Sequence, residues 1–370
     1  MKITHVEPIL LRYTPPRAPR DGLAGIPSRD VFLLRIDTDE GISGIGEGFA
    51  LGSLESTAAL VNETLTPLLL GQDPTMIEQL WNHMYQYTFR YGRRGILIAG
   101  LSAIDIALWD ILGKVSGQPV YKLLGGAHDS LEPYASAGYY MEGKTPADLG
   151  AEAKNYQDMG FRIMKMKVGG ATIPEDMERI QAVRDAVGYD FKLAIDANNA
   201  WDYTDALRMA RFCEKMDIFF FEEPLSSDHL EDSIRLAEAT DVPIAGYETQ
   251  LTSYGMRDFI CRHGVDIAQW DVIWTGGISE CRKVSTLANC WNKQCIPHFS
   301  ASMVSLAANL HCGMGMHNVH YFEYTLDDNP LRDELSLYPI KMKNGRVTVP
   351  DLPGIGVELN PDTVAKYRIG

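Results

Sequence analysis

The chain of 370 residues is longer than one average domain, and 45% of its residues are hydrophobic, which is enough for a large core. Its formal net charge of -15, from 34 basic and 49 acidic residues, argues against nucleic-acid and membrane-surface partners. Its six cysteines contain no CxxC pair and no apolar run has the length of a membrane span, so we expect a cytoplasmic protein without disulfides, signal peptide or membrane helix.

Residues 1–125 are expected to form a mixed α+β domain. Two apolar runs, 31–36 and 44–48, flank Asp39-Glu40-Gly41, and this arrangement predicts a hairpin. We interpret the Gly-x-Gly at the start of the second run as part of a tight turn, because a phosphate loop needs a third glycine and a following helix.

Two helices are expected after this hairpin. Asp73-Pro74 supplies an N-cap and a first-turn proline for a helix that reaches about Tyr91. A second helix, from Arg94 to about Gly113, is apolar nearly all round. A helix with no polar face is buried, so we expect this one in the core.

From about residue 131, short apolar runs alternate with amphipathic helices, and this pattern predicts parallel strands joined by right-handed crossovers. Eight strands are expected around 132–139, 161–168, 191–196, 217–222, 242–247, 265–271, 294–298 and 319–323, with seven helices between them. The proline-rich tail is expected to leave this barrel as loop and short strands. We therefore divide the chain into a cap (1–125), a barrel (126–329) and a C-terminal segment (330–370).

Lys165 and Lys167 lie two residues apart in one expected strand, so both side chains face the inside of the barrel. Buried lysines are costly, which favours a functional role over that of solvated lysines at a strand end. We interpret Lys167 as a general base whose pKa is lowered by Lys165 and by a nearby metal ion.

Asp196, Glu222 and Glu248 follow one another at intervals of 26 residues, and each comes where an apolar run stops. A strand, a helix and two loops take up about this length, so the spacing places each carboxylate at the end of a successive barrel strand. Three converging carboxylates repel one another, and all-oxygen ligands select a hard cation, Mg²⁺ first and Mn²⁺ as the alternative. The competing interpretation is three exposed acids at loop starts.

Two neighbouring positions stay open on the sequence alone. Asn198 faces the same side as Asp196, where it either supports the metal or substrate or caps its own loop. Of Glu222 and Glu223, only one can point inward from a strand, and the spacing does not choose between them.

A second set of candidates follows the later strands. Asp271 and His298 end neighbouring runs, and a carboxylate that holds a histidine raises its pKa and fixes its tautomer, which suits a general acid or base. Glu323 ends the eighth run and is a candidate for hydrogen bonding to substrate. The remaining histidines, around residues 311–320, are spaced too irregularly to predict a zinc site.

In combination these motifs resemble the enolase superfamily, and within it the mandelate racemase subgroup. The resemblance covers nearly the whole chain and rests on Lys165-x-Lys167, Asp196-x-Asn198, Glu222-Glu223-Pro224, Glu248, Asp271 with Gly276-Gly277, and His298. It implies an α/β fold with a (β/α)7β barrel and a cap built from the N-terminal domain and the tail. It also implies a Mg²⁺ ion held by Asp196, Glu222 and Glu248, a cap-to-barrel helix at 102–114, and a homo-oligomer.

The chemistry implied by the resemblance is abstraction of the proton α to a carboxylate, which leaves an enediolate stabilised by Mg²⁺ and Lys165. With Lys167 and His298 on either face, dehydration of a sugar acid is the first choice of reaction. Racemisation or epimerisation, and opening of a sugar-acid lactone as in a cycloisomerase, are the alternatives. Arg17 and Arg20, in a cap loop, are candidates for substrate binding. A Schiff-base aldolase using Lys167 and a non-catalytic binding protein are the alternatives from other classes.

Overall fold

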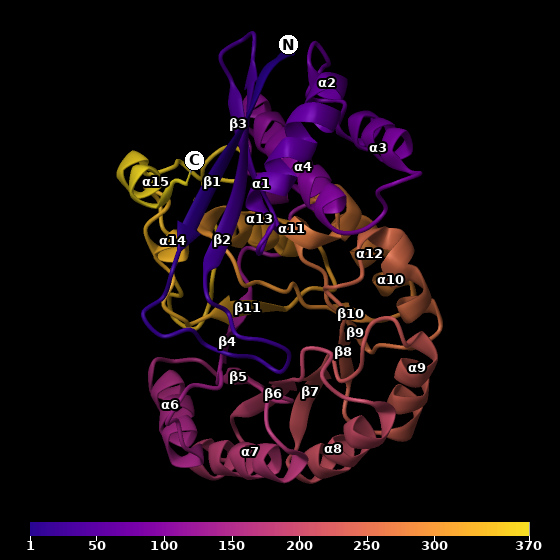
Figure 1. Cartoon of the computed structure of the whole chain (residues 1–370), viewed down its shortest axis with the longest axis vertical. Helices are drawn as coiled ribbons and strands as arrows, with labels where there is room; N and C mark the ends of the chain where they lie inside the picture. The colour runs from indigo at the N-terminus through magenta and orange to yellow at the C-terminus, as the bar shows by residue number, and fades with distance from the viewer. Residues whose placement is uncertain (370) are drawn as a thin grey trace.

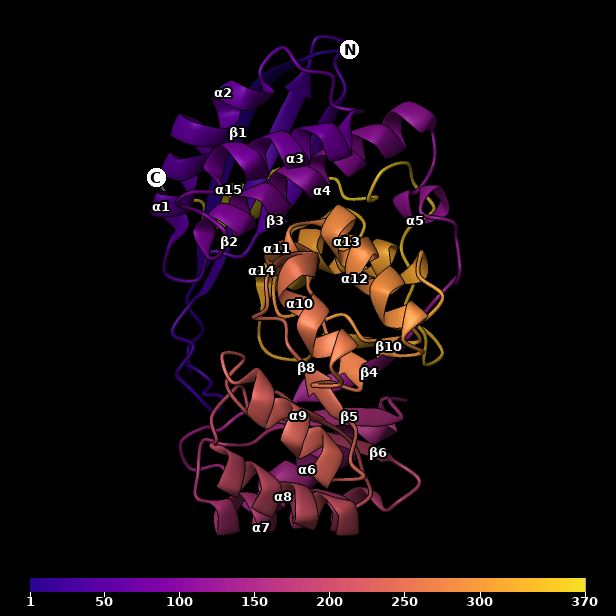
Figure 2. The same ribbon diagram turned by 90° about the vertical axis from the view of Figure 1, so that its right-hand side faces the viewer.

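The computed structural model describes residues 1–369 and has two architectural parts (Figure 1). At one end an antiparallel sheet is packed against helices, and at the other a curled parallel sheet is surrounded by helices (Figure 1). Figure 2 shows α10, α12 and α13 lying between the N-terminal part and the helices α7 and α8 at the far end. The expected α/β fold class is confirmed.

The N-terminal part contains a three-stranded sheet with the order β1-β2-β3. Its strands are β1 Ile3–Tyr13, β2 Arg29–Thr38 and β3 Ser43–Gly48. The hairpin expected between the second and third strands is confirmed, since β2 and β3 pair antiparallel. The remaining elements of this part are α1 Leu54–Leu60, the π-helix Val61–Leu65, α2 Thr66–Leu69, α3 Ile77–Thr88, α4 Ile96–Ser116 and α5 Val120–Leu123. Helix α3 begins later than expected, because Asp73 accepts hydrogen bonds from Thr75 in a separate turn.

The glycines of β3 serve close packing, and the expectation of a tight turn there is wrong. Gly44, Gly46 and Gly48 all lie within the strand and face helix α4. A Cβ atom on Gly46 would come 1.9 Å from the carbonyl oxygen of Ala103 on α4. With no side chains between them, the strand and the helix pack backbone against backbone.

We expect Gly46→Ala to lower the free energy of unfolding by about 3 kcal/mol, because the added methyl group collides with main chain that cannot rotate away. Urea denaturation followed by circular dichroism measures the change. Gly25→Ala is the matched control and should stay within about 0.5 kcal/mol, since nothing lies within 4 Å of a Cβ atom there. Equal stability of the two variants would contradict the packing argument.

Helix α4 joins the two parts of the molecule. It has the length and mean hydropathy, 1.9, of a membrane span, but 89% of that segment is buried inside the fold, as expected of a core helix. Asp105 accepts hydrogen bonds from the backbone N–H and the hydroxyl of Ser279 at the start of α12. Asp110 accepts from the backbone N–H groups of Ile45 in β3 and Ile355 in the tail. The expected cap-to-barrel helix is therefore confirmed.

The parallel sheet has the strand order β10-β9-β8-β7-β6-β5-β4-β11. Its strands are β4 Glu132–Ala137, β5 Ile163–Lys167, β6 Lys192–Asp196, β7 Ile218–Glu222, β8 Ile244–Gly246, β9 Ile267–Ala268, β10 Gln294–Cys295 and β11 Tyr321–Thr325. A parallel bridge between Cys295 and Val319 joins the two edges of the curled sheet. All eight strands lie within the ranges expected from the sequence or overlap them by most of their length.

One main helix follows each strand except the last within the described residues. These helices are α6 Pro146–Asp158, α7 Ile173–Val187, α8 Tyr203–Lys215, α9 Leu230–Ala239, α10 Thr252–Cys261, α12 Ile278–Cys290 and α13 Met303–Met314, with the single turn α11 Val272–Thr275 before α12. Helices α6 and α7 begin at capping boxes formed by Thr145 with Asp148 and by Thr172 with Glu175. This is the (β/α)7β arrangement expected from the resemblance.

Buried side chains fill the inside of the curled sheet below its carboxyl ends. This cluster consists of Tyr134, Ile163, Ala194, Phe220, Ala245, Ile267 and Ile296. The sheet therefore encloses a packed core, and polar side chains collect only above it, at the carboxyl ends of the strands.

The C-terminal segment runs back to the N-terminal sheet. It contains α14 Pro330–Asp333 and α15 Pro361–Tyr367, and Leu11 of β1 forms an antiparallel bridge with Arg368. Instead of the short strands expected in this tail, the structure has two short helices and isolated bridges. The division of the chain at residues 125 and 329 stays a prediction.

Candidate active site

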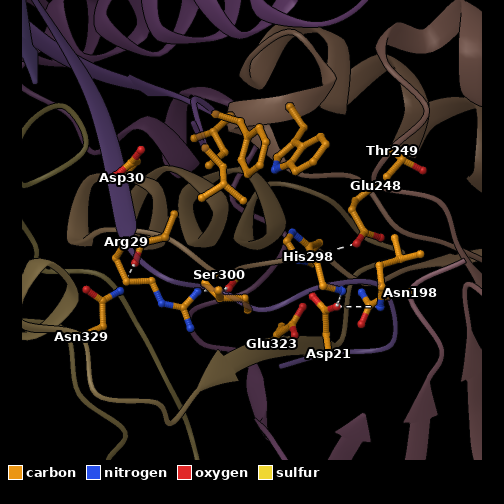
Figure 3. A pocket seen from close by; sticks show the side chains of 18 of the residues that line it. Asp21, Arg29, Asp30, Asn198, Glu248, Thr249, His298, Ser300, Glu323 and Asn329 are labelled. Carbon is orange, nitrogen blue, oxygen red and sulfur yellow. Dashed lines mark hydrogen bonds and ion pairs between the residues drawn. The ribbon is translucent and has the colours of Figure 1, made fainter. Parts of the chain in front are cut away.

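A cavity of about 290 Å³ lies between the carboxyl ends of the barrel strands and the loops of the N-terminal part. Figure 3 shows its polar side chains, which come from both parts of the chain. The barrel contributes Tyr139, Lys167, Asn198, Asn199, Glu223, Glu248, Thr249, Ile273, Trp274, His298, Ser300, Ala301, Glu323 and Asn329. The N-terminal part contributes residues of the segments 21–31 and 47–51.

The two lysines of β5 both point inward, as the alternation of the strand predicts. Lys165 is fully buried, and its Nζ lies 2.5 Å from Glu222 Oε1 and 2.8 Å from Glu323 Oε1. Lys167 Nζ lies 2.5 Å from Asp196 Oδ2 and lines the cavity. Burial disfavours charge on both lysines, but the carboxylates around them outweigh it and raise the pKa of each amine. The expected lowering of the Lys167 pKa by Lys165 and a metal ion stays a prediction, and the pairing with Asp196 acts in the opposite direction.

Asp196, Glu222 and Glu248 lie at the ends of β6, β7 and β8, which are neighbours in the sheet. All three side chains are buried, with exposed fractions of 4% or less. Gln269 Nε2 donates to Glu222 Oε2 at 2.6 Å, and the backbone N–H of Asn198 donates to Asp196 Oδ1 at 2.9 Å. The alternative of exposed acids at loop starts is excluded.

These carboxylates fit a cation site by their chemistry. Glu248 Oε2 and Asn198 Oδ1 are buried and have no hydrogen-bond partner, although both residues line the cavity. An unpaired buried carboxylate oxygen is costly unless a cation or hydrogen bond compensates it. Residues 1–369 hold no set of three acidic, histidine or cysteine side chains already arranged around one metal position, because Lys165 and Lys167 are the present partners of Glu222 and Asp196.

Both residues of the Glu222-Glu223 pair turn toward the site, so the expectation that only one points inward is wrong. Glu222 is the last residue of β7, whereas Glu223 has a left-handed backbone with φ of 41° that breaks the alternation. Asn199 Nδ2 donates to Glu223 Oε2 at 2.5 Å, and Thr249 Oγ1 donates to Oε1 at 3.1 Å. Burial and the neighbouring Glu248 raise the pKa of Glu223.

Asp271 and His298 form the expected pair. Asp271 Oδ2 lies 2.9 Å from His298 Nδ1, which leaves Nε2 on the side of Glu248, at 3.8 Å from its Oε1. Asn309 on α13 donates to Asp271 Oδ1 at 2.8 Å and fixes the carboxylate. Burial opposes charge on the ring, but Glu248, Glu323 and Asp271 outweigh it and raise the pKa of His298 to about 10.

The last two strand-end candidates also lie at the cavity. Glu323 Oε1 accepts from Ser136 Oγ and Lys165 Nζ, and Oε2 accepts from the backbone N–H of Phe299 at 3.0 Å. Burial opposes ionisation of Glu323, but Lys165 and His298 lower its pKa. Asn198 turns its side chain to the cavity from a left-handed backbone position with φ of 47°.

The two arginines proposed for substrate binding are not among the residues that line this cavity, and their role stays a prediction. Arg20 stacks on the ring of Tyr140, and Arg17 lines a neighbouring pocket. The residues that line the cavity include instead Arg29, at the start of β2, whose side chain is buried and ion-paired with Asp327. A charged residue directly before an apolar strand was the only signal for Arg29 in the sequence.

The N-terminal part also covers the cavity with residues that the sequence analysis did not name. Phe49 stacks on Trp274 with ring centroids 3.6 Å apart, and its backbone N–H donates to the carbonyl of Ile273. Glu47, which lines the cavity, accepts from the backbone N–H of Ser305 and the hydroxyl of Ser302 at the start of α13. Burial raises the pKa of Glu47 to about 7.

Comparison with known proteins relates the whole chain to enzymes. Residues 20–125 match the family described as mandelate racemase / muconate lactonizing enzyme, N-terminal domain, and residues 148–363 match the family described as enolase C-terminal domain-like. An arabinonate dehydratase from Saccharolobus solfataricus is 43% identical over 94% of this chain and 92% of its own length. A D-galactarolactone cycloisomerase from Agrobacterium fabrum is 34% identical over 100% of this chain and 99% of its own. The crystal structure of a racemase from Streptomyces coelicolor A3(2) with bound magnesium has a TM-score of 0.92 at 29% identity and covers 99% of this chain and 100% of its own.

Proposed function

The chain belongs to the mandelate racemase / muconate lactonizing enzyme family of the enolase superfamily, and from this premise we propose that it is a sugar acid dehydratase. The reaction removes the proton α to the carboxylate and then expels the hydroxyl group from the neighbouring carbon as water. The observation that carries the proposal is that Lys167 and the Asp271–His298 pair line one cavity beside three strand-end carboxylates. The relative named arabinonate dehydratase supports the choice of dehydration.

We assign Asp196, Glu222 and Glu248 as the ligands of a Mg²⁺ ion, with Mn²⁺ as the alternative. When bound, the dication supplies positive charge that stabilises the enediolate formed as the α-proton leaves. Lys165, whose ammonium group is buried beside Glu222, adds a second fixed positive charge on the same side of the site. The unpartnered Glu248 oxygen and the magnesium-bound racemase of similar fold support this assignment.

Lys167 is the proposed base, and it must be neutral to accept a proton. Its pair with Asp196 favours the ammonium form, and a cation held by Asp196 would weaken that pair and favour the neutral amine. Lys165 disfavours a second positive charge nearby and so lowers the pKa of Lys167 once Asp196 no longer compensates it. Lys167 then takes the α-proton from the face of the substrate that it contacts.

His298 is the proposed acid. Burial lowers the pKa of His298, but Asp271, 2.9 Å from Nδ1, raises it and leaves Nε2 on the cavity side to donate a proton. Donation to the departing hydroxyl group lowers the barrier to carbon–oxygen cleavage.

Other outcomes of the same intermediate remain second candidates. Reprotonation of the intermediate by His298 would make the enzyme a racemase or epimerase. Elimination from a cyclic substrate would make it a cycloisomerase, and the relative named D-galactarolactone cycloisomerase supports this alternative. A Schiff-base aldolase has less support, because the relatives are named as a dehydratase and a cycloisomerase. Cytoplasmic location and homo-oligomer formation stay predictions.

Metal binding tests the ligand assignment within the adjacent glutamates. We expect Glu222→Gln to weaken Mg²⁺ binding by at least about 100-fold and Glu223→Gln by less than about 10-fold, since loss of a direct ligand costs more than loss of a supporting group. Isothermal titration calorimetry with MgCl₂ measures both, and circular dichroism verifies folding. The exposed Glu238→Gln is the control and should bind like wild type. A larger loss for Glu223→Gln would transfer the ligand role to that residue.

A further inference from the structure

The cavity has two polar ends with different electrostatic character. Glu248, His298 and Asn198 lie at one end (Figure 3), and Lys167 lies there too, because its partner Asp196 accepts from the backbone N–H of Asn198. Figure 3 shows Arg29, Ser300 and Asn329 on the other side, and we call these three residues the distal end. Because Arg29 and Lys167 are the arginine and lysine side chains among the lining residues, the charge state of the distal end depends on Arg29.

The positive charge of Arg29 is already neutralised within the protein. Its guanidinium group forms an ion pair with Asp327, which also binds Arg332 Nη1 at 3.1 Å. Arg332 Nη2 in turn binds Asp333 at 2.8 Å. Two arginines and two aspartates thus form a chain of zero net charge, and the two arginines and Asp327 are largely buried.

The other acidic residue beside the distal end is compensated as well. Asp30 binds Arg12 through two hydrogen bonds of 2.7 and 2.9 Å and also accepts from Ser28. Its side chain is 1% exposed. These contacts lower the pKa of Asp30 despite its burial and keep the pair ionised. The distal end as a whole therefore offers no unpaired cation to a second anionic group.

Hydrogen-bonding capacity does remain at the distal end. Arg29 Nε is buried and has no hydrogen-bond partner. Ser300 Oγ accepts from Arg29 Nη1 at 3.4 Å, which leaves its own O–H free to donate. Asn329 is satisfied, since it donates to the carbonyl of Ala301 and accepts from the backbone N–H of Leu331. A neutral ligand group that both accepts and donates, such as a hydroxyl, matches Arg29 and Ser300.

We propose that the substrate is an aldonate, a sugar acid with a single carboxylate, whose terminal hydroxyl groups bind Arg29 and Ser300. The second carboxylate of an aldarate would be buried beside Asp327 with no free cation, and burying an uncompensated charge is strongly unfavourable. The inference rests on the proposed function, because it assumes that the first carboxylate binds at the Lys167 end.

The test compares acids that share a configuration and differ only at the far carbon: arabinonate with arabinarate, and galactonate with galactarate. We expect kcat/KM for the preferred aldonate to exceed that for its aldarate by at least about 100-fold, and calorimetric binding to follow the same order. Equal or better use of the aldarate overturns the inference. Selective aldonate binding without dehydration would support the aldonate inference and overturn the proposed dehydratase function. Binding of neither class of acid would overturn both the inference and the proposed function.

A variant that leaves Arg29 without its counter-ion tests the same inference. In Asp327→Asn the guanidinium group loses its counter-ion, so we expect the aldonate-to-aldarate ratio to fall by at least about 10-fold. Asp328→Asn is the matched control, since it removes the same charge from an exposed neighbour that contacts Tyr13, and it should keep the wild-type ratio. An unchanged ratio in folded Asp327→Asn overturns the inference. If that variant does not fold, the wild-type ratio decides alone.

Discussion

Lys167→Ala is expected to lower kcat for dehydration by about 10⁴-fold, because it removes the group proposed to take the α-proton. The same variant should also stop exchange of the α-proton with D₂O, which NMR follows independently of product formation. Magnesium affinity should not fall, since the lysine competes with a cation for Asp196. Retained affinity with lost exchange would assign Lys167 to chemistry and not to metal binding.

Lys192→Ala is the control for this experiment. Lys192 is an exposed lysine at the start of β6, at the opposite end of the barrel strands, where it bonds to the hydroxyl of Tyr321. Its removal should leave both exchange and turnover near wild type. Wild-type exchange in Lys167→Ala would show that another residue is the base.

The barrel and most of its site could be predicted, because the end of each strand can be recognised in the sequence. A parallel barrel strand is covered by helices on one side and packed against the barrel core on the other, so its sequence is an apolar run. The first polar residue after this run lies at the carboxyl edge of the sheet. Asp196, Glu222 and Glu248 satisfy this rule, and the structure brings them to one edge of the curled sheet. The spacing of these residues predicted this edge, and the resemblance supplied their expected roles.

Features that depend on contacts between distant segments could not be predicted in this way. Glu223 points to the site because its backbone is left-handed, and the alternation of side chains along a strand does not predict such a conformation. The glycines of β3 look like turn residues until α4 is placed against them. Arg29 contacts Ser300 and Asp327, about 270 and 300 residues further along the chain, so its local sequence carries no sign of its partners.

The charge of Lys167 shows a further limit of prediction from sequence, because it depends on electrostatic partners. The sequence correctly places Lys165 and Lys167 on one face, and the predicted lowering of the Lys167 pKa relied on Lys165 together with a nearby metal ion. In the structure the nearest charge to Lys167 is Asp196, at 2.5 Å, and an opposite charge at that distance outweighs both burial and the second lysine. A pKa depends on the partner present, and neither spacing nor alternation specifies that partner.

His298→Asn is expected to separate the two halves of the reaction. If Lys167 takes the α-proton and His298 protonates the departing hydroxyl group, the variant should lose dehydration by about 10³-fold yet continue to exchange the α-proton with D₂O. If His298 is instead the abstracting base, exchange and dehydration should fall together, while Lys167→Ala keeps exchange. An NMR time course of α-proton loss beside product formation measures both. His320→Asn, an exposed histidine just before β11, is the control.

Asp271→Asn tests the same assignment through pH dependence. Asp271 contributes to the raised pKa of His298, so an asparagine there should lower that pKa, with a smaller loss of rate than in His298→Asn because the imidazole remains. An acid works only while protonated, and the fraction of protonated His298 falls as the pH rises through its pKa. The alkaline limb of the dehydration profile should therefore move to lower pH in Asp271→Asn. A limb that stays in place, or wild-type turnover in His298→Asn, would remove His298 from the role of acid.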